Sequence, residues 1–201
     1  MTILFDSPPT PPFNRCLPSP MPPLTSALAS VLLLAASTFS AVPAALEIPL
    51  SAWEPEDGDN LVIDTEGNEG YLLHADGRYI RFPVITGQTR VVSYIGLVYD
   101  ATTPAGTFAV RSRHVKGDRI TYGPTGRFLR LYDAKGFTHY GIHEHAAEDV
   151  MFARKDRFQS MGCVIVPREM MDILDETYSR NGAIRVVTQY GVGNPVAAAF
   201  Y

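Results

Sequence analysis

Short apolar runs, some alternating with polar residues, recur along residues 61–189 and predict a domain built mainly from β-strands. Two of these runs, residues 71–74 and 79–84, flank the pair Asp76-Gly77. An Asp-Gly pair suits the positive φ angles of a tight turn, so the two runs are predicted to pair as a β-hairpin. Further strands are predicted at residues 61–63, 91–99, 107–111, 127–132, 138–145 and 183–189.

Helical patterns come late in the chain. Residues 168–174 follow Pro167, and Gly182 lies beyond the end of their pattern. Proline near the first helical position and glycine past the last one are typical of helix boundaries. Residues 146–157 fit either a helix or a long loop. The predicted fold class is therefore mainly β with one or two short helices around the segment that contains Cys163.

The first 44 residues are typical of a leader that is removed from the mature protein. Prolines crowd the residues before position 24, the segment 24–39 is apolar, and Val42-Pro43-Ala44 fits signal-peptidase cleavage after Ala44. The alternative is an uncleaved membrane anchor, for which this apolar segment is short. The predicted organisation is a signal peptide and Pro-rich leader at 1–44, a segment leading into the domain at 45–60, and one folded domain at 61–201.

The composition of the chain limits the size of its fold and the kinds of molecule that it can bind. A chain of 201 residues with 46% hydrophobic content can build one domain with a substantial core. Its net charge of −4 gives no basic surface for nucleic acid, so no nucleic-acid partner is expected. No stable membrane span is expected once the signal peptide has been cleaved.

The number and position of the cysteines favour a reactive thiol. Cys16 lies in the predicted leader, so the mature chain would keep a single thiol, that of Cys163. A lone thiol cannot form an intramolecular disulfide, and an exposed one is a liability in an oxidising compartment. Its presence in an exported protein therefore favours a reactive role, although a buried, inert cysteine is the commoner fate.

Cys163 and His143 form a candidate nucleophile–base pair. Cys163 follows Gly162 in the segment Ser160-Met161-Gly162-Cys163, and His143 lies 20 residues earlier, near the end of a predicted strand. A histidine within hydrogen-bond reach can take the thiol proton and later return it to a leaving amine. The peptide N–H groups of Gly162 and Cys163 are candidates for stabilising the oxyanion of an acyl-transfer intermediate.

Two other interpretations remain open at this point. Alternation along a strand puts His143 and His145 on one face, and together with Cys163 they could hold a zinc ion. No second cysteine accompanies them in the mature chain. In the plainest interpretation, Cys163 is a core thiol and His145 a solvated loop residue.

Three segments of the chain together resemble the catalytic domain of L,D-transpeptidases, the YkuD-like family. The segments are the predicted hairpin 70–87 ending in Thr86-Gly87, the Thr-Pro-x-Gly-x-Phe segment at 103–108, and Ile142-His143 followed by Ser160-x-Gly162-Cys163. The resemblance covers residues 61–189. It implies a YkuD-like β-sandwich, acyl transfer on peptidoglycan stem peptides, no metal or other cofactor, and a location in the periplasm or cell wall.

The resemblance also implies roles for individual residues. Cys163 would be the nucleophile, His143 the base and acid, and the backbone oxygen of Glu144 the group that orients His143. Ser160 and Gly162 belong to the same signature loop.

Two positions depart from the family pattern, since Met161 stands where histidine is usual and Ile165 where arginine is usual. Arg168 and His145 are therefore candidate substrate-binding residues. Alternative functions are a peptidoglycan carboxypeptidase or endopeptidase on the same fold, and a non-catalytic wall-binding domain.

Overall fold

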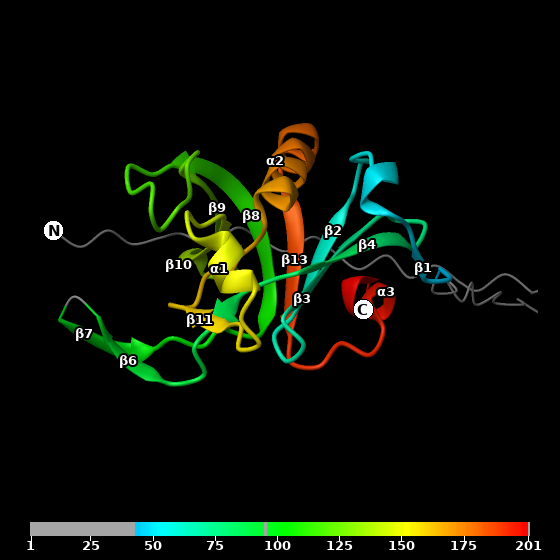
Figure 1. The fold of residues 1–201 in the computed structure, drawn as a ribbon. Helices are drawn as coiled ribbons and strands as arrows, with labels where there is room; N and C mark the ends of the chain where they lie inside the picture. The colour runs from blue at the N-terminus through cyan, green and yellow to red at the C-terminus, as the bar shows by residue number, and fades with distance from the viewer. Residues whose placement is uncertain (1–42, 95, 201) are drawn as a thin grey trace, which may run out of the picture. The chain divides into compact units, whose positions relative to one another are not determined.

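A nine-stranded sheet with three helices forms the domain in the computed structural model, which describes residues 43–94 and 96–200 (Figure 1). The leader predicted for residues 1–44 lies outside the described residues except for Pro43 and Ala44. The strands are β1 (Leu46–Glu47), β2 (Asn60–Asp64), β3 (Glu69–Leu73), β4 (Arg78–Pro83), β5 (Thr86–Gly87), β6 (Val91–Tyr94), β7 (Leu97–Asp100), β8 (Gly106–Val115), β9 (Arg127–Asp133), β10 (Gly136–His143), β11 (Phe158–Ser160), β12 (Val164–Ile165) and β13 (Ile184–Gln189). The helices are the short 3₁₀ turn η1 (Leu50–Ala52), α1 (Glu148–Phe152), α2 (Arg168–Asn181) and α3 (Pro195–Phe200). The prediction of a mainly β fold is confirmed.

The large sheet has the order β1-β4-β3-β2-β13-β8-β9-β10-β12. The predicted hairpin forms between β3 and β4, with Gly77 at φ +91°, a value that favours glycine. The last strand, β13, lies in the middle of the sheet, parallel to β2 on one side and antiparallel to β8 on the other. The first half of the domain is therefore joined to the second half through its C-terminal strand.

A single core contains residues from both ends of this sheet. Ile80 and Phe82 of β4 share it with Ile142 of β10 and Val164 of β12, so the sheet bends around the core and its two halves face each other. Helix α2 closes the core with Met170, Met171 and Leu174. The helix begins after Pro167 and ends at Gly182, which has φ +70°, as the sequence predicts.

A bridge between the two edges of the sheet fixes the segment around Cys163. The backbones of Ile85 and Ile165 exchange hydrogen bonds of 2.9 and 2.8 Å. Beside this bridge, β5 pairs with β11, and β10 pairs in parallel with β12. Residues 161–163 therefore form a loop held at both ends by strands.

The lead-in segment 45–60 contributes to the packing. Strand β1 pairs with β4, and Trp53 stacks on the His74 ring with 3.8 Å between ring centroids. The buried His74 Nδ1 lies 2.7 Å from Oδ1 of Asp59. On the other side of β2 and β3, the short helix α3, which the sequence did not predict, buries Val196 and Ala199. Within residues 43–94 and 96–200, no helix is both long and apolar enough to cross a membrane.

Candidate active site

The loop between β11 and β12 is held in a tight turn by Ser160. The hydroxyl of this buried serine donates to the backbone oxygen of Cys163 at 2.5 Å and accepts the N–H of Gly162 at 3.1 Å. The Gly162 N–H is thereby engaged, which differs from the expected role in an oxyanion site. Among the described residues no acceptor bonds the N–H of Cys163, so this group is the donor that the loop offers to a substrate.

Gly162 has a backbone conformation and surroundings that exclude a side chain. Its φ is +107°, and a Cβ atom there would lie 2.6 Å from Cε1 of Tyr140. Its carbonyl oxygen accepts a hydrogen bond of 3.0 Å from Oγ1 of Thr103, which in turn accepts the N–H of Gly87 at 2.8 Å. The three segments singled out in the sequence therefore meet at one buried hydroxyl group.

Replacing Thr103 by valine is expected to lower the free energy of unfolding by about 2 kcal/mol, because a buried N–H and a buried C=O lose their shared partner. Thiol modification of Cys163 should change in rate as its loop loosens. Denaturant unfolding and alkylation kinetics measure the two effects. The neighbouring Thr102→Val is the matched control, because the Thr102 hydroxyl bonds the exposed Asp100 carboxylate. An equal loss in both variants would contradict the role given to Thr103.

His143 ends β10, opposite Ile165 in the register with β12, and it is buried. Its Nδ1 lies 2.7 Å from the backbone oxygen of Glu144. A carbonyl oxygen only accepts hydrogen bonds, so Nδ1 carries the proton and Nε2 of the neutral ring keeps its lone pair. Burial lowers the pKa of His143 to about 4, against an opposing effect of the Glu144 hydrogen bond, so the ring is neutral at pH 7.

Cys163 is half-buried and lies beside Gly141 across the β10–β12 pairing. Burial raises the pKa of the Cys163 thiol, and the Gly141 amide and the more distant cations Arg130 and Lys116 oppose this effect. At rest Cys163 is therefore a thiol and His143 a neutral imidazole, rather than an ion pair. Both side chains line one pocket of about 430 Å³.

Cys163 also lines a second pocket. It measures about 640 Å³ and lies against the β6–β7 hairpin, whose Leu97 and Val98 line it together with Tyr140. Cys163 and Met161 line both pockets, so Met161, where the family pattern usually has histidine, stands beside the sulfur. Cys163 therefore stands where the two pockets adjoin.

The side chain of Glu144 has a structural role that the sequence did not reveal. Its carboxylate is fully buried and accepts hydrogen bonds from the N–H and hydroxyl of Thr125. Its other oxygen lies 3.2 Å from Nε of Arg168. Arg168 therefore points to Glu144 and lines neither pocket at Cys163. The hydrogen bonds between Glu144 and Thr125 fix the loop that carries Tyr122. The ring centroid of Tyr122 lies 5.0 Å from that of His143.

His145 lines the same pocket as His143 and Cys163, and its Nδ1 accepts the Ala147 N–H at 3.0 Å. Within the part of the chain that the structure describes, no three histidine, cysteine, aspartate or glutamate side chains are grouped so that they could hold a metal ion. The zinc interpretation of His143, His145 and Cys163 therefore lacks the ligand geometry it requires.

The rest of the pocket comes from residues that sequence reasoning missed. Tyr94 contributes from the β6–β7 hairpin, Asp118 and Tyr122 from the loop before β9, and Met151 and Gln159 from the segment around α1. Met151 belongs to the short helix α1 and Gln159 to the short strand β11, and the others lie in a loop or at a hairpin end. None of these segments has a motif of its own, so only the fold shows that they meet at Cys163.

Residues 59–189 match the sequence model of the family described as L,D-transpeptidase catalytic domain (YkuD). The chain is also similar to three solved structures. An L,D-transpeptidase from Xylanimonas cellulosilytica is 24% identical, with a TM-score of 0.46, over 68% of this chain and 63% of that one. The helical cell shape determining protein Pgp2 from Campylobacter jejuni is 17% identical, with a TM-score of 0.49, over 70% and 51%. The catalytic domain of the Enterococcus faecium L,D-transpeptidase is 18% identical, with a TM-score of 0.40, over 67% and 98%.

This chain spans between half and two thirds of the first three solved structures it matches. Among curated proteins, none matches it significantly.

Proposed function

Because this chain belongs to the L,D-transpeptidase catalytic domain (YkuD) family, we propose that it is an exported cysteine acyltransferase that acts on peptidoglycan stem peptides. The observation that carries the proposal is the shared pocket of Cys163 and His143, with the imidazole oriented by the Glu144 carbonyl. A neutral imidazole whose Nε2 carries no proton, in the same pocket as a thiol, is suited to take the proton as the sulfur attacks.

The reaction would run in two halves. In the first, the Cys163 sulfur attacks the carbonyl carbon before a D-residue while Nε2 of His143 takes the thiol proton. The tetrahedral intermediate collapses as His143 returns that proton to the leaving amine, and a thioester remains on the sulfur. In the second half, an acceptor amine attacks the thioester, His143 takes its proton, and the proton returns to sulfur as the C–S bond breaks.

The N–H of Cys163 is the proposed donor to the developing oxyanion, because the Gly162 N–H is already bonded to Ser160. The two pockets that Cys163 lines would serve the acyl donor and the acceptor. Water in place of the amine would make the same thioester the intermediate of a carboxypeptidase or endopeptidase. A non-catalytic wall-binding domain remains the alternative from another class, favoured by Met161 and Ile165.

The test is incubation of the wild-type protein with a stem tetrapeptide, with and without an acceptor amine, followed by intact-mass and product analysis. A thioester on Cys163 together with a cross-linked product supports the acyltransferase. A hydrolysed tripeptide alone identifies the carboxypeptidase. Peptide binding without any covalent adduct or product would overturn the proposal and identify a wall-binding domain.

Export is part of the same proposal, and it rests on the apolar segment 24–39 and Val42-Pro43-Ala44. The mature protein is expected to begin near Ala45 and to reside in the periplasm or at the cell wall. N-terminal sequencing of the fractionated protein tests this, and an intact 1–44 segment on cytoplasmic protein would contradict it.

Removal of metal ions is expected to leave the reactivity of the Cys163 thiol unchanged. Elemental analysis should find no stoichiometric metal, and the rate of Cys163 alkylation should be the same with and without a chelator. A zinc-bound thiolate would behave in the opposite way, because the metal blunts its reactivity. One zinc per chain together with faster alkylation after chelation would replace the proposed mechanism by a metal-dependent one.

A further inference from the structure

The pocket around Cys163 and His143 lacks the cation that the family pattern usually provides. Ile165 lines this pocket where arginine is usual, and Arg168 is held by the Glu144 carboxylate. Among the described residues that line the pocket there is no lysine or arginine. The nearby cations Lys116 and Arg130 lie over the Phe128 ring, which does not line this pocket. A carboxylate group of a substrate would therefore have to find its positive partner elsewhere.

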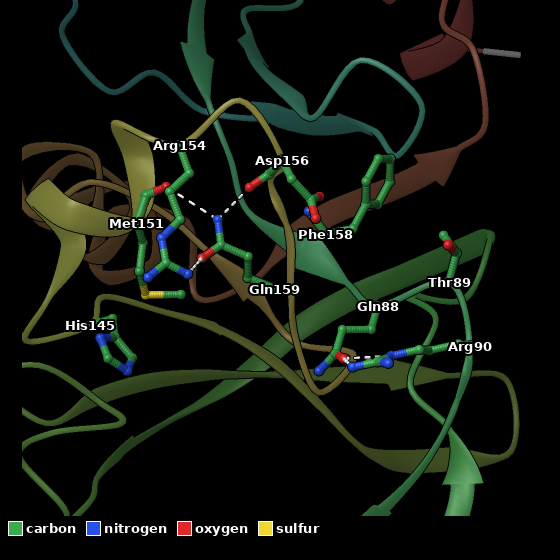
Figure 2. Close-up of a pocket in the computed structure, with 9 residues that line it drawn as sticks. All are labelled: Gln88, Thr89, Arg90, His145, Met151, Arg154, Asp156, Phe158 and Gln159. Atoms are coloured by element: carbon green, nitrogen blue, oxygen red, sulfur yellow. Dashed lines mark hydrogen bonds between the residues drawn. The ribbon is translucent and has the colours of Figure 1, made fainter.

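A neighbouring pocket of about 730 Å³ supplies such a partner, and Figure 2 shows its lining residues. It adjoins the site, because His145, Met151 and Gln159 line both pockets. We call it the arginine pocket, and its lining residues are Gln88, Thr89, Arg90, His145, Met151, Arg154, Asp156, Phe158 and Gln159.

Two guanidinium groups enter the arginine pocket from opposite sides, Arg154 from the segment after α1 and Arg90 from the segment after β5 (Figure 2). Arg154 donates to Oε1 of Gln159 at 3.4 Å, and Arg90 donates to Oε1 of Gln88 at 2.9 and 2.7 Å. Both acceptors are neutral amides. Within the described residues neither arginine has a carboxylate at ion-pair distance, whereas Arg168 does.

The remaining charged and titratable groups leave the arginine pocket net positive. Asp156 also lines it, and Oδ1 of Asp156 accepts the Phe158 N–H at 2.9 Å. The His145 pKa is lowered by burial, so this ring adds no charge at pH 7. The side-chain N–H₂ of Gln159 donates to the backbone oxygens of Met151 and Asp156, which turns its oxygen toward Arg154. Two guanidinium groups therefore face a single carboxylate.

We propose that the arginine pocket binds a free carboxylate of the peptide whose scissile carbonyl lies at Cys163, with Arg154 as the main contact and Arg90 as the second. A guanidinium presents paired N–H donors that match the two oxygens of a carboxylate. Because both arginines are exposed, the contribution to affinity is expected to be about three- to fivefold. This inference rests on the proposed function, because it takes a stem peptide as the ligand.

The experiment measures the affinity of the Cys163→Ala protein for three synthetic stem tetrapeptides by calorimetry. One peptide has all carboxyl groups free, one has a C-terminal amide, and one has its internal carboxyl converted to an amide. Arg154→Gln and Arg90→Gln are compared in the same background. Lys155→Gln is the matched control, because it removes the same charge from the adjacent residue, which does not line the pocket.

The fully free peptide is expected to bind about three- to fivefold more tightly than one of the two amides. The amide that binds more weakly identifies which carboxylate is bound. Arg154→Gln should lose about the same factor for the free peptide and should no longer distinguish the two ligands. Equal affinity for all three peptides, no binding of the free peptide, or an equal loss from Lys155→Gln would overturn the inference. If the proposed function itself is wrong, the intact-mass experiment on the wild-type protein will show no thioester, and this result is separate from the affinities measured here.

Discussion

Cys163→Ala is expected to abolish covalent labelling of the protein by a carbapenem and by a stem tetrapeptide. The thiol is the single cysteine side chain among the described residues, and it stands where two pockets meet, so no neighbouring group can take its place. Intact-mass spectrometry measures the adduct, which should fall below detection. The thermal midpoint should stay close to that of the wild type, because the change removes one half-buried sulfur atom.

Cys163→Ser provides the sharper comparison for the same prediction. A hydroxyl is a far weaker acid than a thiol, so a neutral imidazole should leave the serine variant orders of magnitude slower than the wild type. A full-strength adduct on either variant would mean that the nucleophile is another residue.

His143→Gln is expected to slow acylation of Cys163 by about 100- to 10,000-fold, the range for loss of a general base. Glutamine keeps an N–H donor for the Glu144 oxygen but cannot accept and return a proton at neutral pH. His114→Gln is the control, because His114 lines neither pocket at Cys163. A larger loss from His145→Ala than from His143→Gln would assign the base to the other histidine.

The pH profile gives an independent reading of His143. Its pKa of about 4 lies below the ordinary histidine value because burial disfavours the charged ring. The neutral, active form should therefore persist down to about pH 5, and acylation should fall with a midpoint near 4 as the ring becomes protonated. His143→Gln should lack this acid limb. A wild-type midpoint near the ordinary value of about 6.5 would show that the ring is solvated.

Much of the fold follows from local pattern because its strands carry their own signals. The β3–β4 hairpin needed only two apolar runs and an Asp-Gly turn, and α2 needed Pro167 and Gly182. The short strands β5, β11 and β12 carry no such signal. Two or three residues are too few to show a period, and their pairing is imposed by partners more than 20 residues away. The packing of Trp53 on His74 has no local signal either, because Trp53 lies in a segment rich in prolines and acids.

Some residues of the candidate site can be predicted from the sequence, and others cannot. Cys163, His143, Ser160 and Gly162 stand out because their spacing resembles a family signature. Arg168 was given a substrate-binding role because it was the nearest cation in sequence, but its partner is a buried carboxylate 24 residues earlier. Long-range charge pairing of this kind leaves no trace in the order of residues. The arginine pocket has no sequence signal either, because Arg90 and Arg154 belong to separate loops that only the fold brings together.

The central position of β13 has a consequence for when the thiol acquires its surroundings. Strand β2 pairs with a strand that begins more than 120 residues later, so the middle of the sheet cannot close until nearly the whole chain is available. Contacts of such long sequence separation slow folding, because the chain loses loop entropy before they form. The Ile85–Ile165 bridge also joins distant parts of the chain, so it is expected at the same late stage. During synthesis Cys163 would thus be an ordinary solvated cysteine. Its reactivity would appear only when folding is complete, which separates the time of synthesis from the time of activity.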